Sequence, residues 1–92
     1  MQDTVFRWSE EKNNLLKSSS DRISFEKVVI ALKDGKILDI IPSPTHNRQE
    51  CFVVNVDEYI YIVPFVKEDS SIFLKTIYPS RKFTKYYLGG KK

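Results

Sequence analysis

The sequence has few of the residues that most metal, redox and nucleotide sites use. Its 92 residues include one cysteine, Cys51, one histidine, His46, and three glycines. A single cysteine excludes an internal disulfide and a cysteine-based zinc cluster, and it fits a reducing compartment. There is no Gly-rich phosphate loop, no Ser/His/Asp arrangement and no carboxylate cluster with metal-ligand spacing. The sequence therefore predicts neither a cofactor nor a metal site.

Long hydrophobic runs are also missing. The longest uncharged apolar run is the eight residues from Tyr59 to Val66, whereas a membrane helix needs about 20. The start, Met1-Gln2-Asp3-Thr4, lacks the basic flank and apolar segment of a signal peptide. With 41% hydrophobic and 29% charged residues the balance is that of a globular protein. We expect one cytoplasmic domain over residues 1–92, with no membrane contact.

Charge is distributed unevenly along the chain. The segment from Lys75 to Lys92 carries six basic residues and no acidic one, while the rest carries nine basic and twelve acidic residues. This distribution predicts a localised surface that faces an anion. A lysine-rich tail that only aids solubility is the alternative for Lys91 and Lys92.

The N-terminal half predicts two helices. Phe6 and Trp8 form a short apolar entry strand or an extended lead-in, and Ser9 then caps a lightly packed helix that runs to about Lys17. Ser24 caps a second helix that ends at Asp34-Gly35. Its buried face is expected to include Phe25, Val29 and Leu32.

The second half predicts strands and one short helix. Four antiparallel strands are expected over residues 36–41, 51–56, 59–66 and 71–78, with Asp57-Glu58 as a tight hairpin turn. Pro64 cannot donate to a ladder, so its strand is expected to be an edge or to carry a bulge. Ser80 caps a last helix with Phe83 and Tyr87 on one face. The prediction is an α+β domain with two N-terminal helices, a four-stranded antiparallel sheet and a short C-terminal helix.

Candidate functional residues gather in the stretch from Lys75 to Tyr87. Arg81 and Lys82 fall in the first turn of the last helix, where cations oppose the helix dipole. Their placement makes sense if an anion binds there, and Lys75 and Tyr78 precede them closely. Cations interleaved with aromatic residues are what single-stranded RNA requires, because phosphates need charge and bases need flat faces for stacking.

Each candidate also has a purely structural alternative. Phe83, Tyr86 and Tyr87 would then only pack the helix on the sheet, with Lys85 in solvent. Trp8 stacks on a base or anchors the core. His46, a possible acid or base, is treated as an exposed loop residue.

Three motifs resemble the BrnT family of toxins. They are Phe6-Arg7-Trp8-Ser9-Glu10-Glu11-Lys12, Ile23-Ser24-Phe25-Glu26, and Tyr78-Pro79-Ser80-Arg81-Lys82 followed by Tyr86-Tyr87. Their order and spacing match over nearly the whole chain. The resemblance implies a RelE-like fold and a toxin of a bacterial type II toxin–antitoxin module.

The resemblance also implies an activity, partners and a site. Members cleave RNA without a metal and halt translation, and a cognate BrnA-like antitoxin wraps the toxin, so that DNA is reached only indirectly through the antitoxin. By position, the resemblance implies Arg81, Lys82, Trp8 and Lys12 as site residues, and the residue pattern described above adds Lys75, Tyr78, Lys85, Tyr86 and Tyr87. Arg81, Lys82, Lys75 and Tyr78 are the catalytic candidates, and Trp8, Lys12, Lys85, Tyr86 and Tyr87 are the RNA-binding candidates. We expect Arg81→Ala to abolish cleavage without unfolding the protein.

Two other functions stay open. The Lys-His-Gly that usually precedes the second helix in this family is replaced by Ser19-Ser20-Asp21-Arg22, and no general base can be assigned. Both facts favour a non-catalytic module that binds RNA or an acidic antitoxin segment. A housekeeping interaction domain without a nucleic-acid role is the third possibility.

Overall fold

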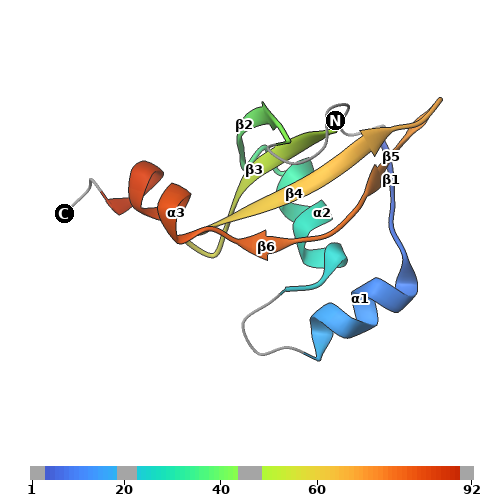
Figure 1. The fold of residues 1–92 in the computed structure, drawn as a ribbon, viewed down its shortest axis with the longest axis horizontal. Helices are drawn as coiled ribbons and strands as arrows, with labels where there is room; N and C mark the ends of the chain where they lie inside the picture. Colours follow the sequence, from blue (N-terminus) through green and yellow to red (C-terminus); the bar gives the residue numbers. More distant parts are fainter. Residues whose placement is uncertain (1–3, 19–22, 44–48, 90–92) are drawn as a thin grey trace.

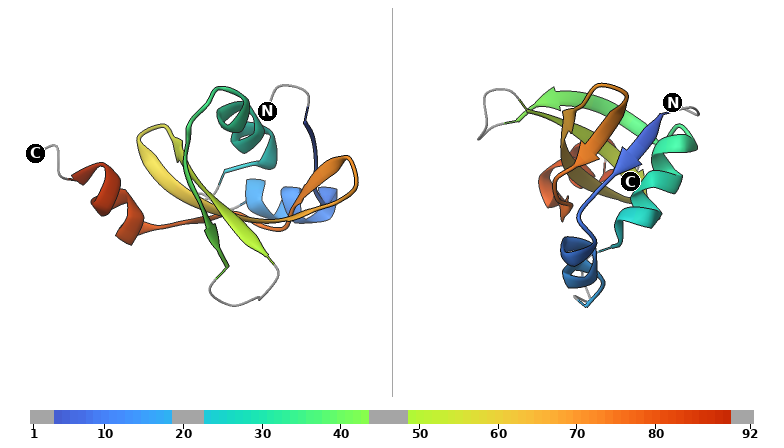
Figure 2. Two further views of the ribbon diagram at one scale, coloured as in Figure 1. Left: turned by 90° about the horizontal axis from the view of Figure 1, so that it is seen from above. Right: turned by 90° about the vertical axis from the view of Figure 1, so that its right-hand side faces the viewer.

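The chain folds into one twisted sheet with helices on both faces (Figures 1 and 2). The structure, a computed structural model, describes residues 4–18, 23–43 and 49–89. In chain order the elements are β1 (Val5–Arg7), α1 (Glu10–Lys17), α2 (Phe25–Lys33), β2 (Ile37–Pro42), β3 (Glu50–Val56), β4 (Tyr59–Lys67), β5 (Ser71–Leu74), β6 (Tyr78–Pro79) and α3 (Arg81–Tyr87). The predicted α+β class with two N-terminal helices and a short C-terminal helix is confirmed. Each helix in the described part of the chain is too short or too polar to cross a bilayer.

The sheet has more strands than the sequence predicted. Its order is β1-β5-β4-β3-β2, with β6 also paired to β4, and only the β1–β5 pair is parallel. The prediction of four antiparallel strands is therefore wrong in number. The lead-in around Phe6 joins the sheet as β1, and the single strand expected over 71–78 is divided into β5 and β6.

Pro64 explains that division. It lies in β4, which is a central strand, and pairs with Cys51 of β3 without a shift of register. The expectation of an edge strand is therefore wrong, but the ladder is irregular beside Pro64, where the three residue steps from Ile62 to Phe65 face the four from Leu74 to Tyr78. The Pro64 carbonyl accepts the backbone N–H of Lys75 at 2.8 Å. Because the N and C=O groups of one strand residue point to the same side, the missing N–H of Pro64 faces the break at residues 75–77.

Two apolar clusters hold the helices on the two faces. On one face α2 buries Phe25, Val28 and Leu32 against a cluster that includes the stacked rings of Phe52 and Phe65, whose centroids lie 4.1 Å apart. On the other face α3 packs through Phe83, Tyr87 and Leu88 on Cys51, Val53, Ile60 and Ile62. In Figure 1, α3 lies at one end of the molecule, so it covers only part of its face.

The predicted helix starts and the predicted hairpin are confirmed. Ser9, Ser24 and Ser80 each accept a backbone N–H three residues on, which satisfies a donor of the first helical turn. Asp57 and Glu58 have φ of 54° and 66°. Positive φ at both positions of a two-residue turn matches the twist of the flanking strands.

Asn13 is the core residue that sequence reasoning missed. It is fully buried in α1, its Oδ1 accepts the N–H of Phe25 at 2.8 Å, and its Nδ2 donates to Glu26 Oε1 at 2.9 Å. One carboxamide therefore joins α1 to the first turn of α2. Leu16 is the other buried residue of α1, so the expectation of a lightly packed helix holds except for this polar anchor.

This anchor predicts a pH dependence of stability. The hydrogen bond from Asn13, with help from Lys17, lowers the pKa of the Glu26 carboxyl below its ordinary value of 4.5. When a carboxyl has a lower pKa in the folded state than in the unfolded state, its ionisation stabilises the fold at pH values above the unfolded-state pKa. This stabilisation is lost as the pH falls through the folded-state pKa. We expect the free energy of unfolding to fall on acidification below about pH 4.5 and Glu26→Gln to flatten that slope. Urea titrations at several pH values measure it, and an unchanged slope would contradict the assignment.

Candidate functional site

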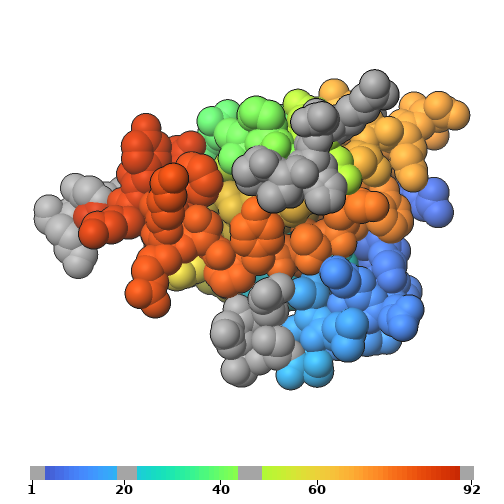
Figure 3. Space-filling view, in the orientation of Figure 1, coloured from blue at the N-terminus to red at the C-terminus, as the bar shows by residue number. Residues whose placement is uncertain are grey.

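A cationic pocket lies where the break between β5 and β6 meets α1 and the segment before β3. It encloses about 290 Å³. The residues that line it are Lys12, Ser43, Gln49, Pro64, Lys75, Thr76 and Tyr78. The lining therefore includes two lysines, three hydroxyl-bearing residues and one glutamine, and none of the described lining residues is a carboxylate. In Figure 3 the segment of the break and β6, in orange, lies directly above α1, in blue.

The backbone holds both lysines of the pocket in place. Lys75 is tied to Pro64 by its N–H, and its Nζ lies 5.6 Å from the centroid of the Phe73 ring, a cation–π contact. Lys12 is in the first turn of α1, where its N–H donates to Ser9 Oγ at 3.2 Å. Neither lysine is in an ion pair with another described residue, since the pairs there use Arg7, Lys17, Lys27 and Lys67. Both charges are available to an anion.

Tyr78 adds a neutral hydroxyl to this site. Burial, with a smaller contribution from the Cys51 thiol, raises the pKa of Tyr78 above its ordinary value of 10.0. The phenol therefore stays protonated at neutral pH and can donate a hydrogen bond to an anion. Burial also raises the pKa of Cys51 above 9.0. Its thiol is fully buried, so it is suited to packing rather than to nucleophilic attack.

Only part of the predicted site comes together in the pocket. Lys75 and Tyr78, predicted as catalytic, and Lys12, predicted to bind RNA, line it from segments far apart in the sequence. The other predicted site residues do not line it. They are Arg81, Lys82, Lys85, Tyr86, Tyr87 and Trp8.

Those on α3 form a second surface, defined by Arg81, Lys82, Lys85 and Tyr86. All four are exposed, and the Tyr86 ring, 75% exposed, meets Tyr87 edge to face at 4.9 Å. Tyr87 itself packs on the sheet. The helix is fixed to β4, because Ile60 donates its N–H to Thr84 Oγ1 and accepts that of Ser80, both at 2.9 Å. The surface therefore has a defined place on the molecule.

Trp8 takes the structural role that the sequence left open. Its ring stacks on Phe25 at 5.7 Å with an interplanar angle of 17°, and its Nε1 donates to Glu10. Because the Trp8 ring already stacks on Phe25, less of its surface is available for stacking on an RNA base. His46, the possible acid or base, lies outside the described residues.

Sequence reasoning missed Ser43, Gln49 and Thr76. Ser43 and Gln49 flank a loop, and the N–H of Ser43 donates to the carbonyl of Gln49 at 2.9 Å. Thr76 was placed inside a continuous strand, whereas it lies in the break. Pro64 was the one signal in the sequence for the break between β5 and β6. Because Pro64 has no backbone N–H, it marks a point of β4 where the strand paired beside it can be interrupted.

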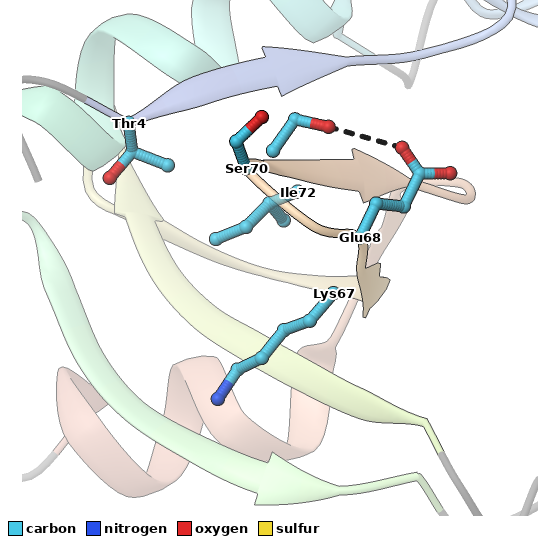
Figure 4. A pocket seen from close by; sticks show the side chains of 6 residues that line it. Thr4, Lys67, Glu68, Ser70 and Ile72 are labelled. Atoms are coloured by element: carbon cyan, nitrogen blue, oxygen red, sulfur yellow. Dashed lines mark hydrogen bonds between the residues drawn. The ribbon is translucent and has the colours of Figure 1, made fainter.

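A second cavity lies at the β4–β5 hairpin beside the start of β1 (Figure 4), and it encloses about 330 Å³. Glu68 accepts the Ser71 hydroxyl at 3.1 Å and pairs with Arg7 at 3.3 Å. Lys67 also lines the cavity, and its ammonium group lies 4.0 Å from Glu50 Oε1. Its charges are mixed and partly paired, so it lacks the uniform positive charge of the first pocket.

Comparisons with protein-family models, with curated proteins and with solved structures find no match. The resemblance to BrnT toxins therefore stays a prediction.

Proposed function

We propose that the protein is the toxin of a bacterial toxin–antitoxin module, a metal-independent endoribonuclease that acts in the cytoplasm and is neutralised by a BrnA-like antitoxin. The observation that carries the proposal is the pocket. Lys12, Lys75 and Tyr78 line it together with no carboxylate among its described residues. An RNA phosphate fits two ammonium groups and a neutral phenol, because all three are hydrogen-bond donors.

The proposed reaction is attack of a ribose 2′-oxygen on the adjacent phosphorus. The 2′-O–P bond forms, the P–O5′ bond breaks, and the products are a 2′,3′-cyclic phosphate and a 5′-hydroxyl. Lys12 and Lys75 stabilise the charge that develops on the phosphoryl oxygens. Tyr78 donates its proton to the departing O5′, and the 2′ proton passes to solvent.

The α3 surface extends this proposal along the RNA chain. Arg81, Lys82 and Lys85 supply cations, and Tyr86 supplies a face on which a base can stack. We propose that neighbouring nucleotides bind here while the scissile phosphate occupies the pocket. Arg81 then serves to position the strand, a narrower role than the catalytic one that the family resemblance implies.

Expression in a bacterial host tests the toxin proposal. We expect induction of the wild type to arrest growth and fragment total RNA, and we expect Arg81→Ala and Lys75→Met to reduce both effects while the purified variants stay folded. Lys33→Met is the matched control, because it removes one exposed charge on α2, which covers the opposite face of the sheet. Undiminished toxicity in both site variants would contradict the assignment of Arg81 and Lys75 to the RNA site.

The lining of the pocket also favours a second function. None of its described residues is a carboxylate or an imidazole, the groups that most often act as general bases near neutral pH. A module that binds RNA, or an acidic segment of an antitoxin, needs the two lysines but no base. Healthy growth and intact RNA on expression, together with RNA binding by the purified protein, would select this function.

A further inference from the structure

The strand β2 forms an apolar edge of the sheet. In the described part of the chain it pairs only with β3, so its outer side carries backbone groups without a strand partner. Two of its large apolar side chains are also exposed, Leu38 by 42% and Ile40 by 45%. An exposed apolar edge is a template on which another strand can add, and such addition leads to self-association. The backbone hydrogen bonds of β2 decide whether a strand can add there.

The alternation of the ladder fixes which backbone groups of β2 point outward. The N–H of Ser43 donates to the carbonyl of Gln49 at 2.9 Å, so Ser43 faces β3. The pairing with β3 then continues in register back to Asp39. In an antiparallel pair every second residue bonds to its partner strand, and the residues between point their N–H and C=O groups away from it. The outward residues over this stretch are therefore Ile40 and Pro42.

Neither outward position offers a free donor. The N–H of Ile40 already donates to Asp39 Oδ1 at 2.8 Å, and Pro42 has no backbone N–H. The register also shifts between Ile37 and Asp39, and an irregularity of this kind bends and twists an edge strand. A strand that approached residues 39–42 from outside would find carbonyl acceptors but no N–H with which to pair.

We propose that Asp39 and Pro42 block the outer edge of β2 and so prevent a second copy of this chain from adding to the sheet. A second copy is the partner to be excluded, because two β2 strands related by a two-fold axis would pair antiparallel and bring their exposed Leu38 and Ile40 side chains together. The inference does not depend on the proposed function, since no residue of β2 lines the cationic pocket.

Opening the edge tests this proposal. Asp39→Val together with Pro42→Val leaves a free N–H at both outward positions and introduces a residue that favours strands. We expect the double variant to dimerise at protein concentrations at least about tenfold below those at which the wild type associates, because each new pair of copies gains several backbone hydrogen bonds. Sedimentation velocity over a range of concentrations measures this shift.

Hydrogen exchange shows whether the association uses the edge. In a dimer joined through β2 the amides at positions 40 and 42 are hydrogen-bonded, so their exchange in the double variant should slow as the protein concentration rises. A folded double variant that associates no more readily than the wild type would overturn the proposal. Association that leaves these two amides unprotected would overturn it equally.

Asp39→Asn is the matched control. It removes the charge but keeps a side-chain oxygen that can accept the N–H of Ile40, so it should associate no more readily than the wild type. Association of this variant as strong as that of the double variant would show that charge repulsion, and not the lack of a donor, keeps the edge free. If circular dichroism shows that the double variant is unfolded, Pro42→Val alone decides by the same two measurements, since it restores one outward N–H.

Discussion

Replacing both pocket lysines, Lys12→Met with Lys75→Met, is expected to weaken binding of single-stranded RNA by roughly 100-fold at low salt. Each ammonium group is expected to make a charge-assisted hydrogen bond to phosphate, worth about 1.5–3 kcal/mol, and about 1.4 kcal/mol corresponds to a factor of ten. Methionine keeps most of the apolar stem and loses only the Nζ contact with the Phe73 ring at position 75, so the fold should be retained. Fluorescence anisotropy with a cleavage-resistant oligonucleotide measures the effect.

The salt dependence gives this prediction a second measurement. Each phosphate contact to a single strand contributes about −0.7 to the slope of log affinity against log salt. The double variant should therefore show a slope shallower by about 1.4, twice that contribution. Lys33→Met, on the opposite face, should leave both affinity and slope near the wild-type values. Equal losses in the control and in the double variant would show that only overall charge matters and would remove the pocket from the RNA site.

Asn13→Leu is expected to cost about 2–4 kcal/mol of unfolding free energy. The substitution removes the bond to Glu26 and leaves the buried N–H of Phe25 without its acceptor, and an unsatisfied buried donor alone costs about 1–3 kcal/mol. Asn13 is fully buried, so water cannot take the place of the carboxamide. Urea unfolding followed by Trp8 fluorescence measures the loss, because Trp8 stacks on Phe25 at this junction.

The neighbouring residue supplies the control for Asn13. Asn14 has the same side chain on the same helix but is exposed, so Asn14→Leu should change stability by less than about 0.5 kcal/mol. A similar effect of the two substitutions would show that helix propensity, and not the buried bridge, sets the cost. Because Lys12 is adjacent to Asn13, loosening of α1 should also weaken RNA binding at temperatures where the variant is folded.

The residues that line the pocket and the cations of α3 occupy different places in the structure, so they are suited to different roles. The sequence placed Arg81 and Lys82 next to Tyr78 and treated them as one catalytic set. In the structure Tyr78 lines the pocket, whereas Arg81 and Lys82 are exposed in the first turn of α3. The pocket lysines are therefore better placed for chemistry on a phosphate, and the helix is better placed for holding a strand.

Local chemistry determined much of this protein from the sequence alone. A serine before each helix, acidic residues after Ser9 and a two-residue polar turn at Asp57-Glu58 each act within a few residues, so the order of elements could be predicted. The apolar alternation that places Cys51, Val53, Ile60 and Ile62 on one face is equally local. Of the cations from Lys75 to Lys85 in this acid-free segment, only Lys75 lines the pocket.

The tertiary structure decided what depends on distant pairing. Whether Phe6 belongs to a strand depends on β5, some 66 residues away in the Phe6–Ile72 pair, and the role of Pro64 depends on which strand lies beside it. The role of Asn13 depends on its partners, Phe25 and Glu26, which belong to another helix. Gln49 and Lys12 reach the pocket only because the sheet and α1 bring them beside the break. Short-range rules specify the elements, but the site is built where non-local contacts join them.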